Sequence, residues 1–84
     1  MSVNILEQAA HVITGPRQEA YGRPQENFQR IADLWSAYYD SQFTQQDVAI
    51  MMILLKVGRI TEAGATEDTL VDICGYAALA GILD

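Results

Sequence analysis

Apolar residues near the start of the chain recur every three or four positions, as on one face of an amphipathic helix. They are Leu6, Ala10 and Ile13. The pattern predicts a helix over residues 4–14. Gly15 and Pro16 follow directly and end this helix, because glycine suits a left-handed cap and proline cannot continue a helix.

A second stretch of helical spacing follows a polar connector, residues 17–23. Pro24 suits the first turn of a helix, where its missing N–H group has no intrahelical partner to lose. A helix is therefore expected from there to about Asp40. Its apolar stripe consists of Phe28, Ile31, Trp35 and Tyr38, with Tyr39 beside it.

The third helical segment is unusual because it has no polar side. Thr44 and Asp47 have the spacing of a capping box, so the helix is expected to begin near Gln45 and to run to about Arg59. Residues 48–55 are all apolar. Such a helix lies either in the centre of a bundle or against a partner chain.

A fourth helix is predicted after a loop over residues 61–65, with Thr66 as its N-cap. Glu67 and Asp68 fall in its first turn, where the helix dipole favours acids. Its apolar side is made largely of small residues: Leu70, Val71, Cys74, Ala77, Ala78 and Gly81. No segment alternates as a strand would. The expected fold is a single all-α domain over residues 1–84, a compact bundle of about four helices.

Composition narrows the choice of function. The chain has 84 residues, a formal net charge of −6 and a single cysteine, Cys74. A nucleic-acid binder would normally have a basic face, so direct nucleic-acid binding is not expected.

The longest apolar run is far too short to span a bilayer, and the N-terminus lacks the pattern of a signal peptide, so a cytoplasmic location is expected. A domain this small, without a disulfide, is expected to complete its core by homo-oligomerisation.

Three residues of the fourth helix carry the first candidate chemistry. Asp68, Asp72 and Tyr76 have i, i+4, i+8 spacing, which places them roughly on one face. Two carboxylates one turn apart can share a divalent cation such as Mg²⁺. The alternatives are pairing with basic residues or a solvated acidic face.

A second candidate is the pair Lys56 and Arg59, which share a face of the third helix. They could hold a phosphate group, for which the arginine fork is well suited. They could equally form ion pairs with Asp68 and Asp72, or simply interact with the C-terminal end of the helix dipole.

A third candidate lies around the polar connector, where Arg17, Tyr21 and Asn27 offer a cation, an aromatic ring and an amide. One interpretation is a ligand-facing loop. The other is local: Gly22 permits an unusual backbone angle and Asn27 caps its own helix.

Several motifs together resemble a family of small phage and prophage proteins of unknown function. These motifs are Thr14-Gly15-Pro16-Arg17, Tyr21-Gly22-Arg23-Pro24, Asn27-Phe28, Ile31-Ala32-Asp33-Leu34-Trp35, Asp47-Val48-Ala49, Met51-Met52, Leu54-Leu55-Lys56, Arg59, Asp68, Asp72-Ile73 and Gly75-Tyr76-Ala77. The resemblance covers nearly the whole chain.

That family is in turn distantly similar to the MazG-like all-α nucleotide pyrophosphohydrolases. This similarity implies an oligomeric helical bundle that holds Mg²⁺ on a Glu-x-x-Glu and a Glu-x-x-Asp and cleaves nucleoside triphosphates to monophosphate and pyrophosphate. Asp72 matches the final aspartate, but Thr69 stands three positions before it. No Glu-x-x-Glu occurs in this chain, so the carboxylate set is incomplete.

These features predict a phage-encoded nucleotide-handling protein in the cytoplasm of the infected host. Its site would lie between the third and fourth helices and residues 17–27, with Mg²⁺ as cofactor on Asp68 and Asp72. Whether it turns its ligand over is left open. One alternative is sequestration, without turnover, of a nucleotide-like immune signal, which would make the protein a host-defence antagonist. Another is an acidic protein that binds and inhibits a host factor.

Overall fold

The chain forms helices, as the sequence predicts. The structure, a computed structural model, describes residues 3–14 and 23–83. Within them lie four helices and no strand: α1 (Val3–Thr14), α3 (Pro24–Tyr39), α4 (Gln45–Ala63) and α5 (Glu67–Ala80). The expected all-α bundle is confirmed. One predicted boundary is wrong. A loop was expected over residues 61–65, but α4 continues to Ala63, because no glycine lies between residues 60 and 64 to end it earlier.

Both predicted caps at the starts of α4 and α5 are present. The Asp47 backbone N–H group donates to Thr44 Oγ1 at 3.0 Å, and the Thr44 N–H group donates back to Asp47 Oδ2 at 3.0 Å. This capping box satisfies two backbone donors that the helix geometry leaves without partners. In α5 the Thr69 N–H group donates to Thr66 Oγ1 at 3.2 Å.

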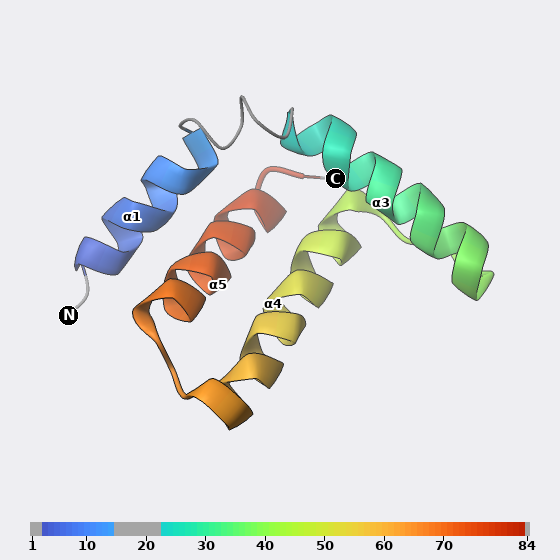
Figure 1. Ribbon diagram of the computed structural model, residues 1–84. Coiled ribbons are helices and arrows are strands. Elements are labelled where there is room, and N and C mark those ends of the chain that lie inside the picture. The colour runs from blue at the N-terminus through green and yellow to red at the C-terminus, as the bar shows by residue number, and fades with distance from the viewer. Residues whose placement is uncertain (1–2, 15–22, 84) are drawn as a thin grey trace.

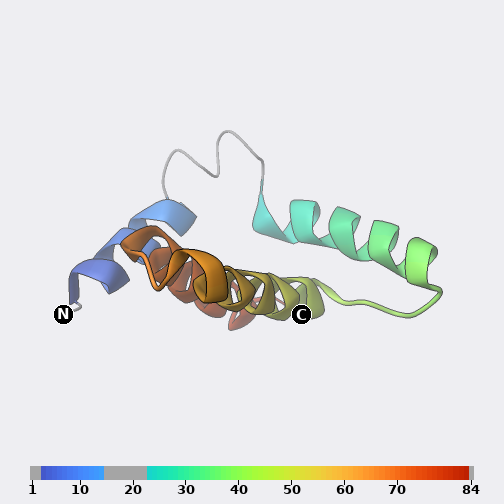
Figure 2. The same cartoon turned by 60° about the horizontal axis from the view of Figure 1, so that its bottom comes forward.

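The helices are arranged around an antiparallel pair, α4 and α5 (Figure 1). Helix α1 packs on α5 on the side away from α4, and α3 packs across the start of α4. Gln46 Nε2 donates to the Ala80 carbonyl oxygen at 2.9 Å, which ties the start of α4 to the end of α5. The last turns of α3 extend past the start of α4 (Figures 1 and 2).

The core lies where α3, the start of α4 and the end of α5 meet. Its buried residues are Phe28, Ala32, Val48, Ala49, Leu79, Ala80 and Leu83. Val48 is the largest side chain that is fully buried. The core is small because most of its members are alanine, valine or leucine, and the chain measures 40 × 30 × 21 Å. A helix with side chains is about 10 Å across, so the thin dimension holds two layers at most.

The structure corrects the predicted buried faces of α1 and α3. In α1 the buried residue is Ala9, whereas Leu6 is 62% exposed. In α3 the predicted stripe is buried at Phe28 but not at Tyr38, which is 92% exposed. The physical reason is the same in both helices. Each of them packs closely against one neighbour, so only a narrow face is covered.

The apolar side of α5 is likewise rotated from its predicted position. Val71, Gly75 and Leu79 are buried, while Ala77 and Ala78 are exposed. Gly75 faces α1: a Cβ atom at this position would lie 3.5 Å from Ile13 Cγ2. A methyl group at this position would therefore make an ordinary van der Waals contact with α1.

Helix α4 is not at the centre of the bundle, although it is apolar all round. Only Val48 and Ala49 are buried among its residues. The exposed apolar side chains are Ile50, Met51, Leu54, Leu55 and Val57. In a bundle two layers thick no helix is surrounded on all sides, so half of α4 faces solvent in the single chain. No helix in the described part of the chain is long and apolar enough to cross a membrane.

Candidate functional site

Two of the predicted site residues meet in a salt bridge between α4 and α5. Lys56 Nζ lies 3.0 Å from Asp72 Oδ2, and the two side chains are 16% and 27% exposed. Lys56 belongs to the middle of α4 and Asp72 to the second turn of α5. They meet because the short link between these helices folds them back antiparallel. The sequence left open a phosphate site, ion pairs with the aspartates or an interaction with the helix dipole. The structure shows an ion pair between Lys56 and Asp72.

The other two charged candidates do not join this pair. Arg59 and Asp68 are both exposed. Over residues 3–14 and 23–83, Lys56–Asp72 is the only ion pair. The four predicted residues therefore lie on adjoining helices without converging on one cluster.

The geometry around Asp72 does not fit a preformed Mg²⁺ site. Mg²⁺ requires near-octahedral oxygen ligands, usually including one or two carboxylates. Here a lysine ammonium group occupies the position next to the Asp72 carboxylate. In the described part of the chain no group of three or more His, Cys, Asp or Glu side chains is placed to hold a metal. Mg²⁺ binding by Asp68 and Asp72 would first require Lys56 to move away.

The predicted aromatic and amide ligands fall in different places. Tyr76 is half-buried, with its ring centroid 6.2 Å from that of Phe28, so it packs against the core. Asn27 is half-buried in the first turn of α3. Arg17 and Tyr21 lie outside the described residues.

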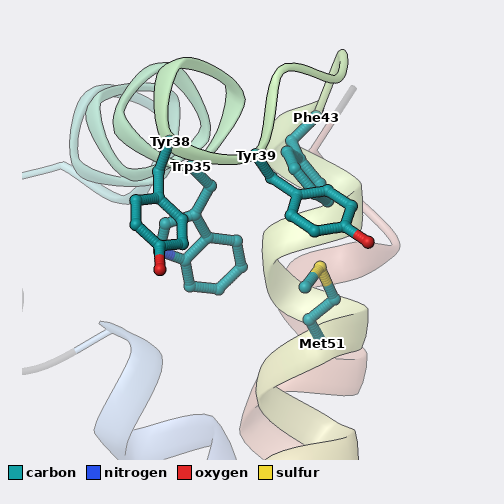
Figure 3. A pocket seen from close by; sticks show the side chains of 5 residues that line it. All are labelled: Trp35, Tyr38, Tyr39, Phe43 and Met51. Carbon is teal, nitrogen blue, oxygen red and sulfur yellow. The ribbon is translucent and has the colours of Figure 1, made fainter.

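An apolar hollow lies in the angle between α3 and α4, where the sequence predicted no site. Its volume is about 290 Å³, and the atoms that line it are apolar. The lining residues are Trp35, Tyr38, Tyr39, Phe43 and Met51. Figure 3 shows the rings of Trp35 and Tyr38 projecting from α3, with Tyr39 and Phe43 near the start of α4 above Met51.

The link between α3 and α4 holds two of these rings in place. Trp35 and Phe43 meet edge to face, with centroids 6.0 Å apart and planes at 85°, a favourable geometry for aromatic pairs. The Phe43 N–H group donates to Ser36 Oγ at 2.9 Å, and Ser36 Oγ donates to the Ala32 carbonyl oxygen at 2.7 Å. One wall of the hollow is therefore built by local hydrogen bonds and is fixed before any ligand binds.

The hollow continues into the exposed side of α4. Ile50, Leu54 and Val57 have i, i+4, i+7 spacing and form a stripe, with Leu55 beside it. We call the hollow and this stripe together the apolar face. Its members are Trp35, Tyr38, Tyr39, Phe43, Ile50, Met51, Leu54, Leu55 and Val57. Monomeric proteins rarely expose a continuous apolar surface of this kind without a binding role.

The spacing of Trp35 and Tyr38 predicted that both belong to the buried stripe of the second helix. The structure instead leaves Tyr38 exposed, while Trp35 is half-buried and packs against the core. The sequence signal for an uncovered side of α4 was the all-apolar run at residues 48–55, for which a partner chain was one of the alternatives.

The chain matches a known protein family. A domain described as "Domain of unknown function (DUF6378)" matches residues 4–84. The chain is 50% identical over 78 residues to the "Gene 55 protein" of Mycobacterium phage L5, and 44% identical over 77 residues to the "Gene 55 protein" of Mycobacterium phage D29. Each alignment covers 92% of this chain and 50% or 51% of the relative. The chain thus spans about half the length of these curated relatives.

No solved structure matches the chain. The expected family of small phage proteins is confirmed. Neither the family description nor the names of the relatives mention MazG-like enzymes, so that similarity stays a prediction.

Proposed function

The chain belongs to the DUF6378 family, whose matched relatives are phage proteins, and we propose that it is a helical protein-interaction module. Its binding surface is the apolar face of α3 and α4. The observation that carries this proposal is the wholly apolar hollow beside the exposed stripe of α4.

The residue types of the apolar face support this function. Tyrosine, tryptophan, phenylalanine and methionine are enriched at protein interfaces, and the aromatic rings bury a large area at little cost in conformational freedom. Tyr38 is 92% exposed, so its burial by a partner would remove most of its ring from water. Burying one such side chain contributes about 1.5–3 kcal/mol.

Charge supports the same function. The chain carries a net charge of −6, but residues 48–55 of α4 contain no charged side chain. Interface cores are depleted of charge in this way, while charges at the rim keep the free protein soluble. The residues that line the hollow include no cation, so a small phosphorylated ligand would find no counter-charge there.

Site-specific photocrosslinking tests the proposal. A photoreactive phenylalanine analogue would replace Tyr38 or Leu54 in the whole chain, and Gln25 in a control. Gln25 is also exposed on α3, but it lies outside the apolar face. We expect covalent adducts with protein from the first two positions and none from Gln25. Adducts should disappear when Leu55→Glu places a charge in the face. No protein adduct, or equal adducts from Gln25, would reject the proposal.

Nucleotide handling with Mg²⁺ is a second proposal. Its support is the family resemblance, together with the position of Lys56, Arg59, Asp68 and Asp72 on adjoining helices. The test is pyrophosphate release from a panel of nucleoside triphosphates with Mg²⁺, and calorimetry with linear and cyclic nucleotides for the sequestration alternative. If neither turnover nor binding is found, this proposal fails.

An acidic inhibitor of a host factor would be a special case of the interaction module. It would depend on charge as well as on the apolar face. Charge reversal at Glu7 or Asp40 would then weaken crosslinking from Tyr38 at low salt. Unchanged crosslinking argues for a partner that is recognised by apolar contact alone.

A further inference from the structure

We propose that the apolar face binds a basic amphipathic helix of another protein. The apolar side of that helix covers the stripe of α4, and its cationic side chains lie beside Asp40, Asp47 and Glu62. This inference rests on the proposed function and names the chemistry of the partner. It is carried by the signs of the charges around the face, by the aromatic rings of the hollow and by the length of the stripe.

Acidic residues border the apolar face at three points. Asp40 is exposed and directly follows Tyr39 of the hollow. Asp47 and Glu62 are exposed near the two ends of the stripe, about 20° and 80° round α4 from Leu54. These three carboxylates make the border of the face negative.

The exposed cations of the same two helices do not balance these acids. Arg30 of α3 lies about 140° round its helix from Trp35, on the side away from the hollow. In α4, Arg59 adjoins Leu55 but lies about 140° round the helix from the centre of the stripe. Lys56 is engaged in its ion pair with α5. Acids therefore outnumber cations three to one at the border of the face.

The sign of this border favours a basic protein segment over other occupants. Charges at the rim of an interface steer encounter and disfavour partners of like charge. The acids would repel an anionic membrane surface or a nucleic acid. A second copy of this chain would bring its own acids to the same border. A segment with lysine or arginine at both ends of an apolar stretch meets no such repulsion.

The aromatic rings of the hollow favour a cation as well. The face of an aromatic ring carries negative potential and attracts lysine and arginine. The hollow is lined by four rings, and none of its lining residues is a cation (Figure 3). A guanidinium group can stack on such a ring while its edges stay hydrogen-bonded to water. An arginine near one end of the partner helix would therefore contact both the rings and Asp40.

The stripe of α4 fits one partner helix along its length. Asp47 and Glu62 are about 22 Å apart along the axis of this continuous helix. Ile50, Leu54 and Val57 lie between them and are exposed. Apolar side chains with this spacing are typical of grooves that bind an amphipathic helix. A complementary helix carries its basic residues about the same distance apart, at the two ends of its apolar side.

Fluorescence of Trp35 gives the first test, because Trp35 is the only tryptophan of the chain and lines the hollow. The probe is a synthetic helical peptide without tryptophan or tyrosine, with leucine at i, i+4 and i+7 and arginines at both ends. A matched peptide carries glutamine in place of arginine. We expect a saturable change with the arginine peptide and about tenfold weaker binding of the glutamine peptide at low salt. Equal affinities, or no binding of either peptide, would overturn the proposal.

Variants of the acidic residues test where the peptide binds. Asp40→Asn combined with Glu62→Gln should weaken binding of the arginine peptide about two- to tenfold at low salt. Asparagine suits position 40, where the backbone is left-handed with φ 52°. Glu26→Gln is the control, because Glu26 is exposed on α3 about 180° round the helix from Trp35. Equal losses in the variant and the control would place the attraction in the net charge and overturn the proposal.

A charge placed in the stripe tests whether apolar contact is needed. Leu54→Glu should abolish binding of the arginine peptide, although it adds an acid. Leu6→Glu is a matched control on α1, because Leu6 is 62% exposed against 63% for Leu54. It should bind the peptide as the wild-type chain does. Binding by Leu54→Glu that equals or exceeds that of Leu6→Glu would overturn the proposal.

The basic partner and the interaction module fail in different ways. Protein crosslinks from Tyr38 and Leu54, without preference for the arginine peptide, remove the basic partner and leave the interaction module standing. A chain that sediments at about twice 9.3 kDa and crosslinks only to itself assigns the face to a second copy, and this also overturns the basic partner. Absence of any protein crosslink and of peptide binding removes both proposals.

Discussion

The ammonium group of Lys56 lies 3.0 Å from the carboxylate of Asp72, and this contact ties the middle of α4 to α5. Both side chains are less than one-third exposed. The pair therefore stabilises the packing of two helices in the place where the sequence also suggested a ligand site. Variants of Lys56 and Asp72 can distinguish a structural role from a ligand-binding role.

Removing one member of the pair should destabilise the fold. Asp72→Asn and Lys56→Met should each lower the free energy of unfolding by about 1.5–3 kcal/mol, because each leaves a half-buried charge without its partner. The double variant Lys56→Met/Asp72→Leu should recover much of this loss. Urea unfolding of the wild-type protein and the three variants measures these losses and the recovery. Unchanged stability in Asp72→Asn would instead favour a ligand-binding role.

The link between α3 and α4 should depend on a single hydroxyl group. Ser36 Oγ bonds both the Phe43 N–H group and the Ala32 carbonyl oxygen. Ser36→Ala should therefore lower the free energy of unfolding by about 1–3 kcal/mol, because it leaves a part-buried N–H group without a partner. Ser41→Ala is the control, since Ser41 is an exposed residue of the same link. Equal losses in the two variants would contradict the role of Ser36.

Replacing Gly58 or Gly64 by alanine should change the stability of the chain in opposite directions. A Cβ atom meets nothing within 4 Å at Gly58 or at Gly64, but Gly64 has φ +80°. Gly58→Ala should stabilise the chain by up to about 1 kcal/mol, because alanine favours the helix interior. Gly64→Ala should destabilise it by about 1–3 kcal/mol, because the left-handed backbone is strained for alanine. Thermal unfolding distinguishes the two signs, and a stabilised Gly64→Ala would refute this account.

The capping box should set the stability of the first turn of α4. Thr44→Ala should cost about 1 kcal/mol, since the Asp47 N–H group loses its acceptor. Thr44→Ser retains the hydroxyl group and should lose little. Hydrogen exchange of the Asp47 amide should accelerate in the alanine variant alone. Similar exchange in both variants would show that the hydroxyl group is dispensable.

The helices could be predicted from sequence because their signals are local. The start of α4 is encoded by Thr44 and Asp47, and that of α5 by Thr66. Each cap satisfies its own helix, whatever the rest of the chain does. The end of α4 was predicted too early, because the helix continues through residues 60–63 until Gly64 ends it.

The candidate site was predicted in part. Lys56 and Asp72 were singled out, and the ion pair was among the alternatives. Arg59 and Asp68 were expected nearby but lie exposed beside it. An uncovered side of α4 was among the alternatives, but the hollow beside it was missed because Trp35 and Tyr38 have the spacing of core residues. Helical spacing identifies a stripe but does not say whether a neighbour covers it.

The sequence by itself determined the helices, their caps and the family, since each depends on residues close together in the chain or on direct similarity. Only the tertiary structure decided which sides are buried. A helix that is apolar all round has no preferred face, so the positions of its neighbours choose one. Here α3 and α5 cover Val48 and Ala49 and leave Ile50, Leu54 and Val57 in water. The tertiary fold also brought Lys56 to Asp72, because their contact depends on how α4 and α5 fold back on each other.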